Sequence, residues 1–213
     1  MVAAVLLARS NYDFELLMGI YRGSVADSVS FWRLITYLGS TWVLIVVVGA
    51  AGLLLSWRNH QEVALWMVLG LVTTSSVVDL LKWLIARARP TVPPLTSFSA
   101  ESFPSGHAAQ SLFVYFFLWV IVATLPRRQK QGLLSQGIRE CLSMVLVSLP
   151  AMVGFSRVYL GVHWPSDVVA GWAIGLFILA IGLLCSLRES EVSSVPACDD
   201  ESARSIEGPR LSG

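Results

Sequence analysis

Long apolar runs separated by short polar connectors dominate this chain of 213 residues. A helix needs about 20 mostly apolar residues to cross a bilayer. Five stretches reach that length, at approximately 36–57, 62–85, 107–125, 140–158 and 167–187. Pro150 should bend the fourth stretch, although neighbouring membrane helices tolerate such a bend. The pattern therefore predicts an all-α fold, a polytopic transmembrane helix bundle.

The two ends of the chain show different patterns. Residues 1–10 are apolar but too short to span a membrane, and residues 11–30 mix apolar and charged positions with a loose helical period. Such a segment is typical of an amphipathic helix at the membrane interface, so residues 1–30 are expected to be interfacial or a partial first helix. Residues 188–213 are rich in Ser, Glu, Asp and Arg, which predicts a disordered polar tail after a membrane domain of residues 1–187.

Composition supports a membrane protein with one domain. Hydrophobic residues make up 55% of the chain, charged residues 14%, and the mean hydropathy is +0.67, whereas soluble domains contain roughly 45–50% apolar residues. The net charge of +1 gives no indication of nucleic-acid binding. Cys141 and Cys185 lie in apolar runs and Cys198 lies in the polar tail, so no disulfide framework or zinc site is expected.

Three polar segments interrupt the apolar pattern. The first, KWLIARARP, carries Lys82 and Arg89 about two helical turns apart, and Pro90 predicts that the helix ends at Arg89. The second, ESFPSGHAAQS, and the third, SRVYLGVHWPSD, carry the other candidate site residues: Ser105, Gly106, His107, Arg157, His163 and Asp167. Each segment alone could be a snorkelling flank, a helix cap or a charged loop.

Their placement along the chain indicates a common site. In a chain of five alternating spans, the end of span two, the start of span three, the end of span four and the start of span five share one membrane face. All three polar segments lie at these positions. Independent snorkelling residues have no reason to choose one face, and ionisable groups at membrane depth are usually functional. We therefore expect one site built from several helix ends.

The residue types favour phosphate chemistry. Lys82, Arg89 and Arg157 supply three cations, and guanidinium groups match phosphate oxygens. The turn formed by Pro104, Ser105 and Gly106 leads into a helix, so its N–H groups and the helix dipole favour an anion at the same place. Together these features predict a phosphate cradle.

Two histidines at this face can supply the remaining catalytic groups. Asp167 follows His163 by four residues, so its carboxylate can fix the imidazole tautomer, which makes His163 the expected nucleophile. His107 is then the general acid, and it takes a proton from water when the phosphohistidine is hydrolysed. Around the site stand only Asp79, Glu101 and Asp167 as carboxylates, so neither a magnesium site nor another cofactor is expected.

Three motifs carry a family resemblance. K-x6-R-P at 82–90, P-S-G-H at 104–107 and S-R-x5-H-x3-D at 156–167 resemble the three-part signature of the type 2 phosphatidic acid phosphatase superfamily, in the same order and without a departure. The resemblance implies a helical membrane enzyme that dephosphorylates lipid phosphates or diphosphates without metal. It assigns phosphate binding to Lys82, Arg89, Ser105, Gly106 and Arg157, and catalysis to His107, His163 and Asp167. Membrane members commonly have six spans, so five or six are expected.

Several alternatives remain open at this point. The substrate could be phosphatidic acid, phosphatidylglycerol phosphate or a polyprenyl diphosphate, and a lipid phosphotransferase would share every catalytic residue. A non-catalytic lipid-phosphate carrier would need the cations but neither His107 nor the His163–Asp167 pair. The sequence does not specify the oligomeric state.

Basic residues predict the orientation. On the face opposite the polar segments, six lie close to span ends: Arg58, Arg127, Arg128, Lys130, Arg139 and Arg188. The positive-inside rule makes that face cytoplasmic. In a bacterial inner membrane the site would then face the periplasm or exterior.

Overall fold

All regular structure in the described residues is α-helical, which confirms the predicted fold class. The computed structural model describes residues 11–22, 26–98, 101–124 and 136–192. The helices are α2 (Asn11–Arg22), α3 (Ala26–Leu38), α4 (Thr41–Trp57), α5 (Gln61–Ile85), α6 (Gly106–Thr124), α7 (Gln136–Tyr159) and α8 (Pro165–Val192).

The membrane-crossing helices match the predicted apolar stretches with one change. By length and composition, α5, α6, α7 and the Pro165–Leu184 part of α8 can each cross a membrane. The first predicted span, 36–57, is broken, because the chain bends by 49° between the helical segments Ser28–Leu38 and Thr41–Trp57, which together can supply a fifth crossing. The bend lies at Gly39, where a side chain would overlap Val153 of α7. Hydropathy does not report close packing of this kind, and it did not indicate the break.

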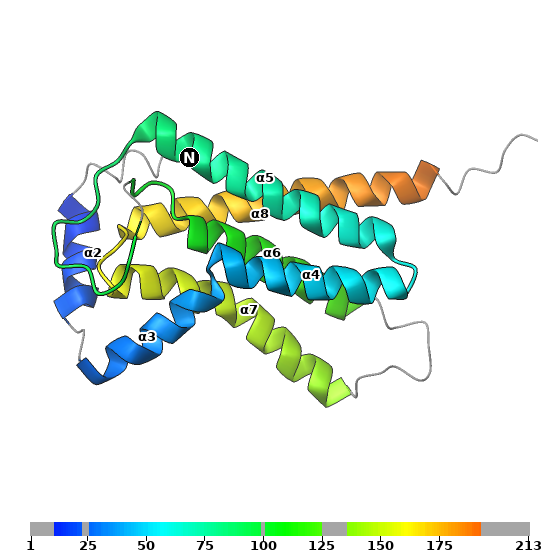
Figure 1. Cartoon of the computed structure of the whole chain (residues 1–213), viewed down its shortest axis with the longest axis horizontal. Helices are drawn as coiled ribbons and strands as arrows, with labels where there is room; N and C mark the ends of the chain where they lie inside the picture. Colours follow the sequence, from blue (N-terminus) through cyan, green and yellow to red (C-terminus); the bar gives the residue numbers. More distant parts are fainter. Residues whose placement is uncertain (1–10, 23–25, 99–100, 125–135, 193–213) are drawn as a thin grey trace, which may run out of the picture.

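Helix α6 occupies the middle of the bundle. It contacts α4, α5, α7 and α8, and Figure 1 shows these helices running along the long axis of the molecule around it. Its buried side chains Phe113, Val114 and Phe117 pack with Leu44 of α4 and Met67 of α5 in the main apolar core. The residue at the start of α6 therefore lies where the ends of several neighbouring helices meet.

Two glycines bring α6 and α8 into close contact. A Cβ atom on Gly171 would lie 2.5 Å from the backbone oxygen of Ser105, and one on Gly175 would overlap the backbone oxygen of Ala109. Small residues four apart on one helix face permit this kind of approach between membrane helices. The contact fixes the start of α6 against the first turns of α8.

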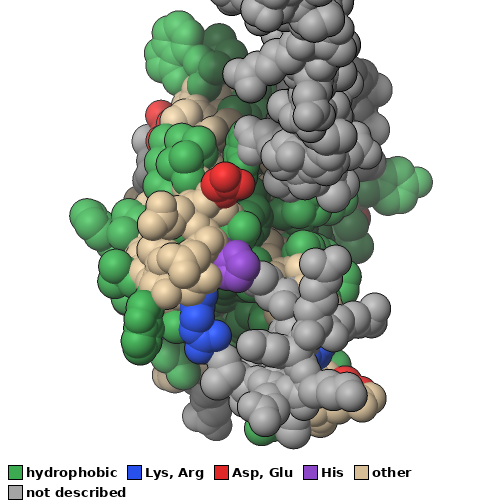
Figure 2. All heavy atoms as spheres, turned by 90° about the vertical axis from the view of Figure 1, so that its right-hand side faces the viewer, with side chains coloured by type: hydrophobic (Ala, Val, Ile, Leu, Met, Phe, Trp, Pro, Cys, Tyr) green, Lys and Arg blue, Asp and Glu red, His purple; other side chains and the backbone are tan. Residues whose placement is uncertain are grey.

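The outer surface suits a lipid environment. Large apolar side chains such as Val46, Leu53 and Phe177 are exposed on the long helices, as expected where lipid rather than protein covers them. Trp57 and Trp83, at the end of α4 and near the end of α5, are 82% and 76% exposed. Trp residues are enriched at both membrane interfaces. Figure 2 faces the end of the molecule with the α4–α5 turn, where a few charged and histidine side chains lie among hydrophobic and other side chains.

Helix α2 lies across the opposite end of the bundle (Figure 1). Its Leu17 is fully buried beside Val158 of α7 and Val168 of α8, whereas Tyr12 and Leu16 are exposed. The predicted amphipathic segment is therefore helical and has one buried and one exposed face. It consists of two helices, because α3 already begins at Ala26.

The C-terminal boundary differs from the prediction. Helix α8 continues to Val192, five residues into the segment 188–213 that composition predicted to be disordered. The sequence Leu187–Val192 contains no Gly or Pro to end a helix. The predictions for residues 1–10 and 193–213 concern residues outside those described.

Candidate active site

The three polar segments meet at the end of the bundle that α2 crosses. Lys82 lies in the last turn of α5 and Arg157 in the last turn of α7, while His107 and Asp167 lie in the first turns of α6 and α8. Four charged or ionisable groups lie near enough to His107 for their charge to act on it: Lys82, Arg89, Arg157 and His163. The structure thus brings together the charged residues that the sequence placed on one face.

The end of α5 differs from the prediction. The helix ends at Ile85, four residues before Arg89, because Ala86 adopts a left-handed conformation with φ 44° and its N–H bonds to the carbonyl of Lys82 at 2.8 Å. Lys82 and Arg89 therefore do not share a helix face. Arg89 reaches the site from the loop after α5, and its charge still acts on Lys82. The prediction that α5 ends before Pro90 is confirmed, but the helix ends about one turn before Arg89, the predicted last residue.

The PSGH segment is fixed to the third motif through the backbone. Ser105 N–H donates to the Asp167 carbonyl at 3.0 Å, and the Ser105 carbonyl accepts the Ala109 N–H at 3.1 Å as the first bond of α6. Gly106 begins the helix and has no side chain at this junction. The first N–H groups of α6 have no partner within the helix, so Ser105, Gly106 and His107 border an N-terminus that favours an anion.

Two buried polar atoms in this region lack a hydrogen-bond partner among the described residues: Ser105 Oγ and Arg157 Nε. Ser105 is fully buried and Arg157 nearly so, and Arg157 Nη1 donates to Thr36 Oγ1 at 2.8 Å. An unsatisfied buried polar group costs about 1–3 kcal/mol. A hydroxyl and a guanidinium N–H in this state are suited to the oxygens of a bound phosphate.

A short turn holds His163 next to Arg157. Gly161, with φ 70°, leads the chain out of α7, and a side chain there would press on Val92 and Tyr21. The carbonyl of Arg157 accepts both the Val162 N–H at 3.1 Å and the His163 N–H at 3.2 Å. This capping of α7 sets the spacing between the cation and the imidazole.

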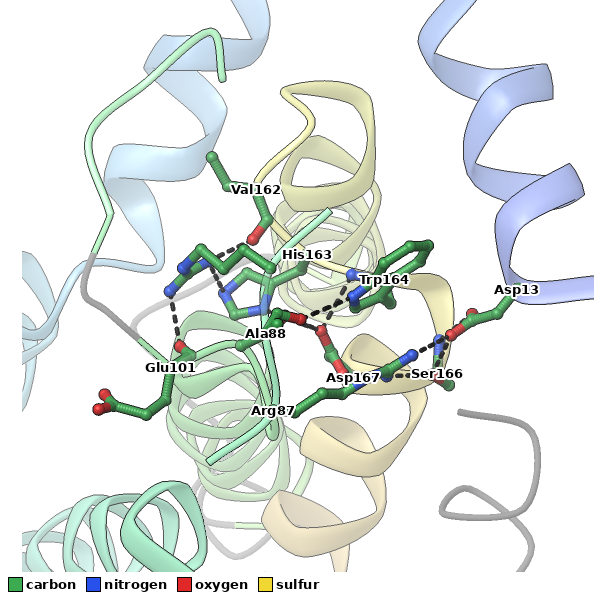
Figure 3. Close-up of polar contacts among 11 residues, drawn as sticks. Asp13, Arg87, Ala88, Glu101, Val162, His163, Trp164, Ser166 and Asp167 are labelled. Carbon is green, nitrogen blue, oxygen red and sulfur yellow. Dashed lines mark hydrogen bonds and ion pairs between the residues drawn. The ribbon is translucent and has the colours of Figure 1, made fainter. Parts of the chain in front are cut away.

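His163 is buried between a cation and a carboxylate (Figure 3). Its Nδ1 lies 3.4 Å from Asp167 Oδ2, and its Nε2 lies 3.4 Å from Arg89 Nη1. Arg89 is anchored by the carbonyls of Val162 and Glu101, the latter at 2.8 Å. The carboxylate thus faces one ring nitrogen and leaves the other directed toward the cationic side of the site.

Burial sets the protonation state of His163. Loss of hydration lowers the pKa of His163 to about 4, an effect that Arg157 and Arg89 reinforce and Asp167 opposes. Burial likewise lowers the pKa of Arg89, while Asp167 and Glu101 act in the other direction. His163 is therefore neutral at neutral pH, with a lone pair on one ring nitrogen.

Sequence reasoning missed five residues that hold Asp167, three of them directly and two through Arg87. Its Oδ2 accepts from the Trp164 N–H at 2.9 Å and from the Ser102 hydroxyl, and its Oδ1 accepts from Arg87 at 2.5 Å. Arg87 also donates to Ser166 Oγ at 2.8 Å and to Asp13 Oδ2 at 2.7 Å. Arg87 resembled a membrane-flanking cation in the sequence, and Asp13 was one charge in a mixed helix.

Clustered metal ligands are not found in the described part of the chain, where no group of three or more His, Cys, Asp or Glu side chains could hold a metal ion. The polar end of the bundle combines the cations Lys82, Arg89 and Arg157 of the predicted cradle with the His163–Asp167 pair, to which Arg87 is bonded.

Fold and site together define an integral membrane protein of helical type with a polar centre at its helix ends. The sequence pattern of the family described as the PAP2 superfamily matches residues 63–191, which is more than half of the chain. The chain belongs to the PAP2 superfamily.

Individual relatives agree with this family. The chain is 32% identical over 147 residues to a phosphatidylglycerophosphatase B of Bacillus subtilis, covering 68% of each chain. It is 28% identical over 174 residues to an undecaprenyl-diphosphatase of Sulfolobus acidocaldarius, covering 79% of this chain and 75% of the relative. The crystal structure of a transmembrane PAP2-type phosphatidylglycerolphosphate phosphatase from Bacillus subtilis superposes with a TM-score of 0.75 at 26% identity, covering 88% of this chain and 94% of that one.

Proposed function

We propose that this PAP2 lipid phosphatase hydrolyses a phosphomonoester or diphosphate on a membrane lipid, without metal, through a phosphohistidine intermediate. The observation that carries the proposal is the pair of unpartnered buried donors, Ser105 Oγ and Arg157 Nε, in the same polar centre as the His163–Asp167 pair. Donors suited to phosphate oxygens and an oriented nucleophile are the two parts that the reaction needs.

Phosphate binding uses the cations and the start of α6. Lys82, Arg89 and Arg157 offset the charge of the phosphate oxygens, and the Ser105 hydroxyl and Gly106 N–H complete the cradle. Binding supplies partners to Ser105 Oγ and Arg157 Nε. The same donors stabilise the extra negative charge that the oxygens carry as phosphorus is attacked.

The first chemical step forms a phosphorus–nitrogen bond. Neutral His163 holds its proton on Nδ1, facing Asp167, and its Nε2 lone pair attacks phosphorus. The bond from phosphorus to the leaving oxygen breaks, and His107, which is protonated in the complex with the anionic phosphate, donates its proton to that oxygen. The released lipid alcohol or lipid monophosphate leaves, and Asp167 stabilises the positive charge on the phosphorylated imidazole.

The second step reverses these roles. His107, now neutral, accepts a proton from a water molecule, whose oxygen attacks phosphorus as the bond to His163 Nε2 breaks. Inorganic phosphate is released, and both histidines return to their starting protonation states.

The substrate class is a lipid whose phosphate lies at the membrane interface. The relatives named above act on phosphatidylglycerophosphate and undecaprenyl diphosphate, so phosphatidic acid, phosphatidylglycerol phosphate and polyprenyl diphosphate are the candidates to test. The position of the site at helix ends, with exposed apolar side chains on the long helices, supports a head group at the polar centre and a tail in the bilayer.

The site is proposed to face the outside of the cell, which for a bacterium is the periplasm or exterior, with the protein in the inner membrane. This orientation follows from the basic residues near the span ends on the other face. In the described residues, Arg58 caps the end of α4 at the far end of the bundle from the polar centre.

Phosphate release tests the proposal directly. Purified protein in detergent with EDTA is supplied with a panel of lipid phosphates and diphosphates, with and without lipid alcohols as acceptors. We expect inorganic phosphate from at least one substrate, no turnover by His163→Ala, and normal turnover by His60→Ala, since His60 is exposed in the α4–α5 turn. Strict metal dependence, or activity in His163→Ala, would contradict the mechanism. Transfer to an added alcohol instead of water would indicate a phosphotransferase, and binding without turnover a carrier.

A further inference from the structure

Asp167 is held by a buried chain of charges that begins on α2. Arg87 Nη1 donates to Asp167 Oδ1 at 2.5 Å, and Arg87 Nη2 donates to Asp13 Oδ2 at 2.7 Å. All three side chains are largely buried, with exposed fractions of 0% for Asp167, 5% for Asp13 and 13% for Arg87. Figure 3 shows Arg87 between the two carboxylates.

Ser166 ties the outer carboxylate to the start of α8. Asp13 Oδ1 accepts the Ser166 N–H at 3.0 Å, Asp13 Oδ2 accepts the Ser166 hydroxyl at 2.5 Å, and Arg87 donates to the same hydroxyl at 2.8 Å. Ser166 N–H is one of the first donors of α8, which no residue within that helix can satisfy. A carboxylate from a helix 153 residues away in sequence thus caps the helix that carries Asp167.

Arg87 has little freedom to move. Its guanidinium carbon lies 5.1 Å from the centre of the Trp164 ring, and Trp164 Nε1 donates to the carbonyl of Ala88 at 3.0 Å. A planar guanidinium stacked on an indole and bonded to two carboxylates has one preferred orientation. The loop after α5 is therefore locked to the turn that contains His163.

This arrangement decides which oxygen of Asp167 faces the imidazole. Arg87 occupies Oδ1, so Oδ2 is the oxygen directed at His163 Nδ1, where Trp164 N–H and the Ser102 hydroxyl also donate to it. Without Arg87 the carboxylate could rotate about its terminal bond and lose this alignment. At metal sites, replacing the groups that orient histidine ligands typically lowers activity by about 10–100-fold, and we expect a loss of similar size for the group that orients the partner of His163.

We propose that Arg87 and Asp13 are positioning residues for the His163–Asp167 pair, with Arg87 orienting Asp167 and Asp13 holding Arg87 and the start of α8. The proposal rests on the proposed function, in which that pair performs the nucleophilic step. Asp13 lies outside residues 63–191, the part that matches the superfamily pattern. Helix α2 therefore contributes to the reaction through Arg87 and Asp167.

Steady-state kinetics of Arg87→Gln, Arg87→Lys and Asp13→Asn test the inference. We expect kcat to fall by about 10–100-fold in Arg87→Gln, with a smaller fall in Arg87→Lys and Asp13→Asn. KM should stay close to the wild-type value, because none of these residues is assigned to phosphate binding. Glu15→Gln is the matched control, since Glu15 is an exposed carboxylate on the same helix, and its kcat should not change.

A double-mutant cycle separates positioning from general stabilisation. If Arg87 acts through Asp167, Arg87→Gln should cost much less in an Asp167→Asn background than in the wild type. Thermal unfolding of each variant in detergent shows whether it is folded, and Asp13→Asn, which keeps the shape of the side chain, carries the test if Arg87→Gln is not recovered folded.

Each outcome has a defined meaning. Wild-type kcat in folded Arg87→Gln or in Asp13→Asn, or equal losses in the two backgrounds of the cycle, would overturn the positioning role. That result together with an inactive His163→Ala would leave the proposed function standing. An active His163→Ala would instead remove the proposed function itself.

Discussion

At the scale of single residues, Asp167 should matter for rate more than for binding. Its oxygens face His163, Arg87, Ser102 and the Trp164 N–H rather than the cations of the proposed cradle. Asp167→Asn should lower kcat by on the order of 10³–10⁴-fold, as when a catalytic histidine loses its orienting carboxylate, and should leave KM nearly unchanged. Initial rates over a range of lipid phosphate concentrations measure both. A raised KM with unaltered kcat would assign Asp167 to substrate binding instead.

The acid side of the pH profile should reflect His163. Burial lowers the pKa of His163 to about 4. The imidazole of the free enzyme therefore keeps its attacking lone pair at pH values well below the ordinary imidazole pKa of about 6.5. The kcat/KM value, which reports the free enzyme, should persist through about pH 6.5 and fall only as the pH approaches 4. The pH profile is measured with two substrates whose phosphates have different pKa values. A fall in kcat/KM that shifts with the substrate reflects ionisation of the phosphate, and one at the same pH for both reflects the enzyme. A decline near pH 6.5 common to both would show that the nucleophile is not a histidine with a lowered pKa.

The sequence predicted the proximity of residues whose pattern is local and missed residues whose partners are distant along the chain. Lys82, Ser105 and His163 belong to short motifs at helix ends, where spacing alone indicated a shared face. The contacts of Asp13 and Arg87 join residues 74 apart, and nothing in the local pattern of either residue reports the other. Charged side chains that are satisfied by tertiary contacts can look like ordinary surface charges in a sequence.

At the scale of helices, the α6–α8 contact should govern stability and the alignment of the site. Gly175→Ala places a methyl group against the backbone of Ala109, and overpacking of this kind costs about 1–3 kcal/mol. Gly182→Ala is the control on the same helix, because no atom lies within 4 Å of its new methyl group. In Gly182→Ala, the better helix propensity of Ala should raise the free energy of unfolding by roughly 0.5–1 kcal/mol. Thermal unfolding in detergent compares the two variants.

The sign of the difference is the test. Gly175→Ala should lower the unfolding temperature, and Gly182→Ala should leave it equal or higher. Equal changes in both would mean that α6 and α8 do not approach each other as closely as Gly171 and Gly175 indicate.

Helix boundaries illustrate the limit of hydropathy at this scale. The apolar pattern found all the long helices, because about 20 apolar residues in a row have few other stable environments. It placed the end of the second stretch at residue 85, where α5 ends, but it did not find the break between Leu38 and Thr41. The end of α5 ahead of Pro90 coincides with the left-handed conformation of Ala86.

At the scale of the whole molecule, the orientation can be tested in intact cells. Single cysteines at Ser97 and Gln131 are introduced into a chain in which Cys141, Cys185 and Cys198 are replaced. Ser97 is exposed on the loop after α5, at the end that carries the polar centre. A membrane-impermeant thiol reagent should label position 97, and it should reach position 131 only after the cells are permeabilised. The reverse pattern would place the site in the cytoplasm and leave the chemistry unaffected.

The covalent intermediate is the centre of the account, and trapping it is the most direct test. Wild-type protein is mixed with a lipid substrate that carries ³²P in the transferred phosphate, and the reaction is stopped within the first turnover by denaturation in alkali. We predict a protein-bound label that is stable in alkali, labile in acid and located in the peptide containing His163. It should be present in His60→Ala and absent from His163→Ala. A label on another residue, or hydrolysis of the lipid with no protein-bound label, would contradict nucleophilic attack by His163.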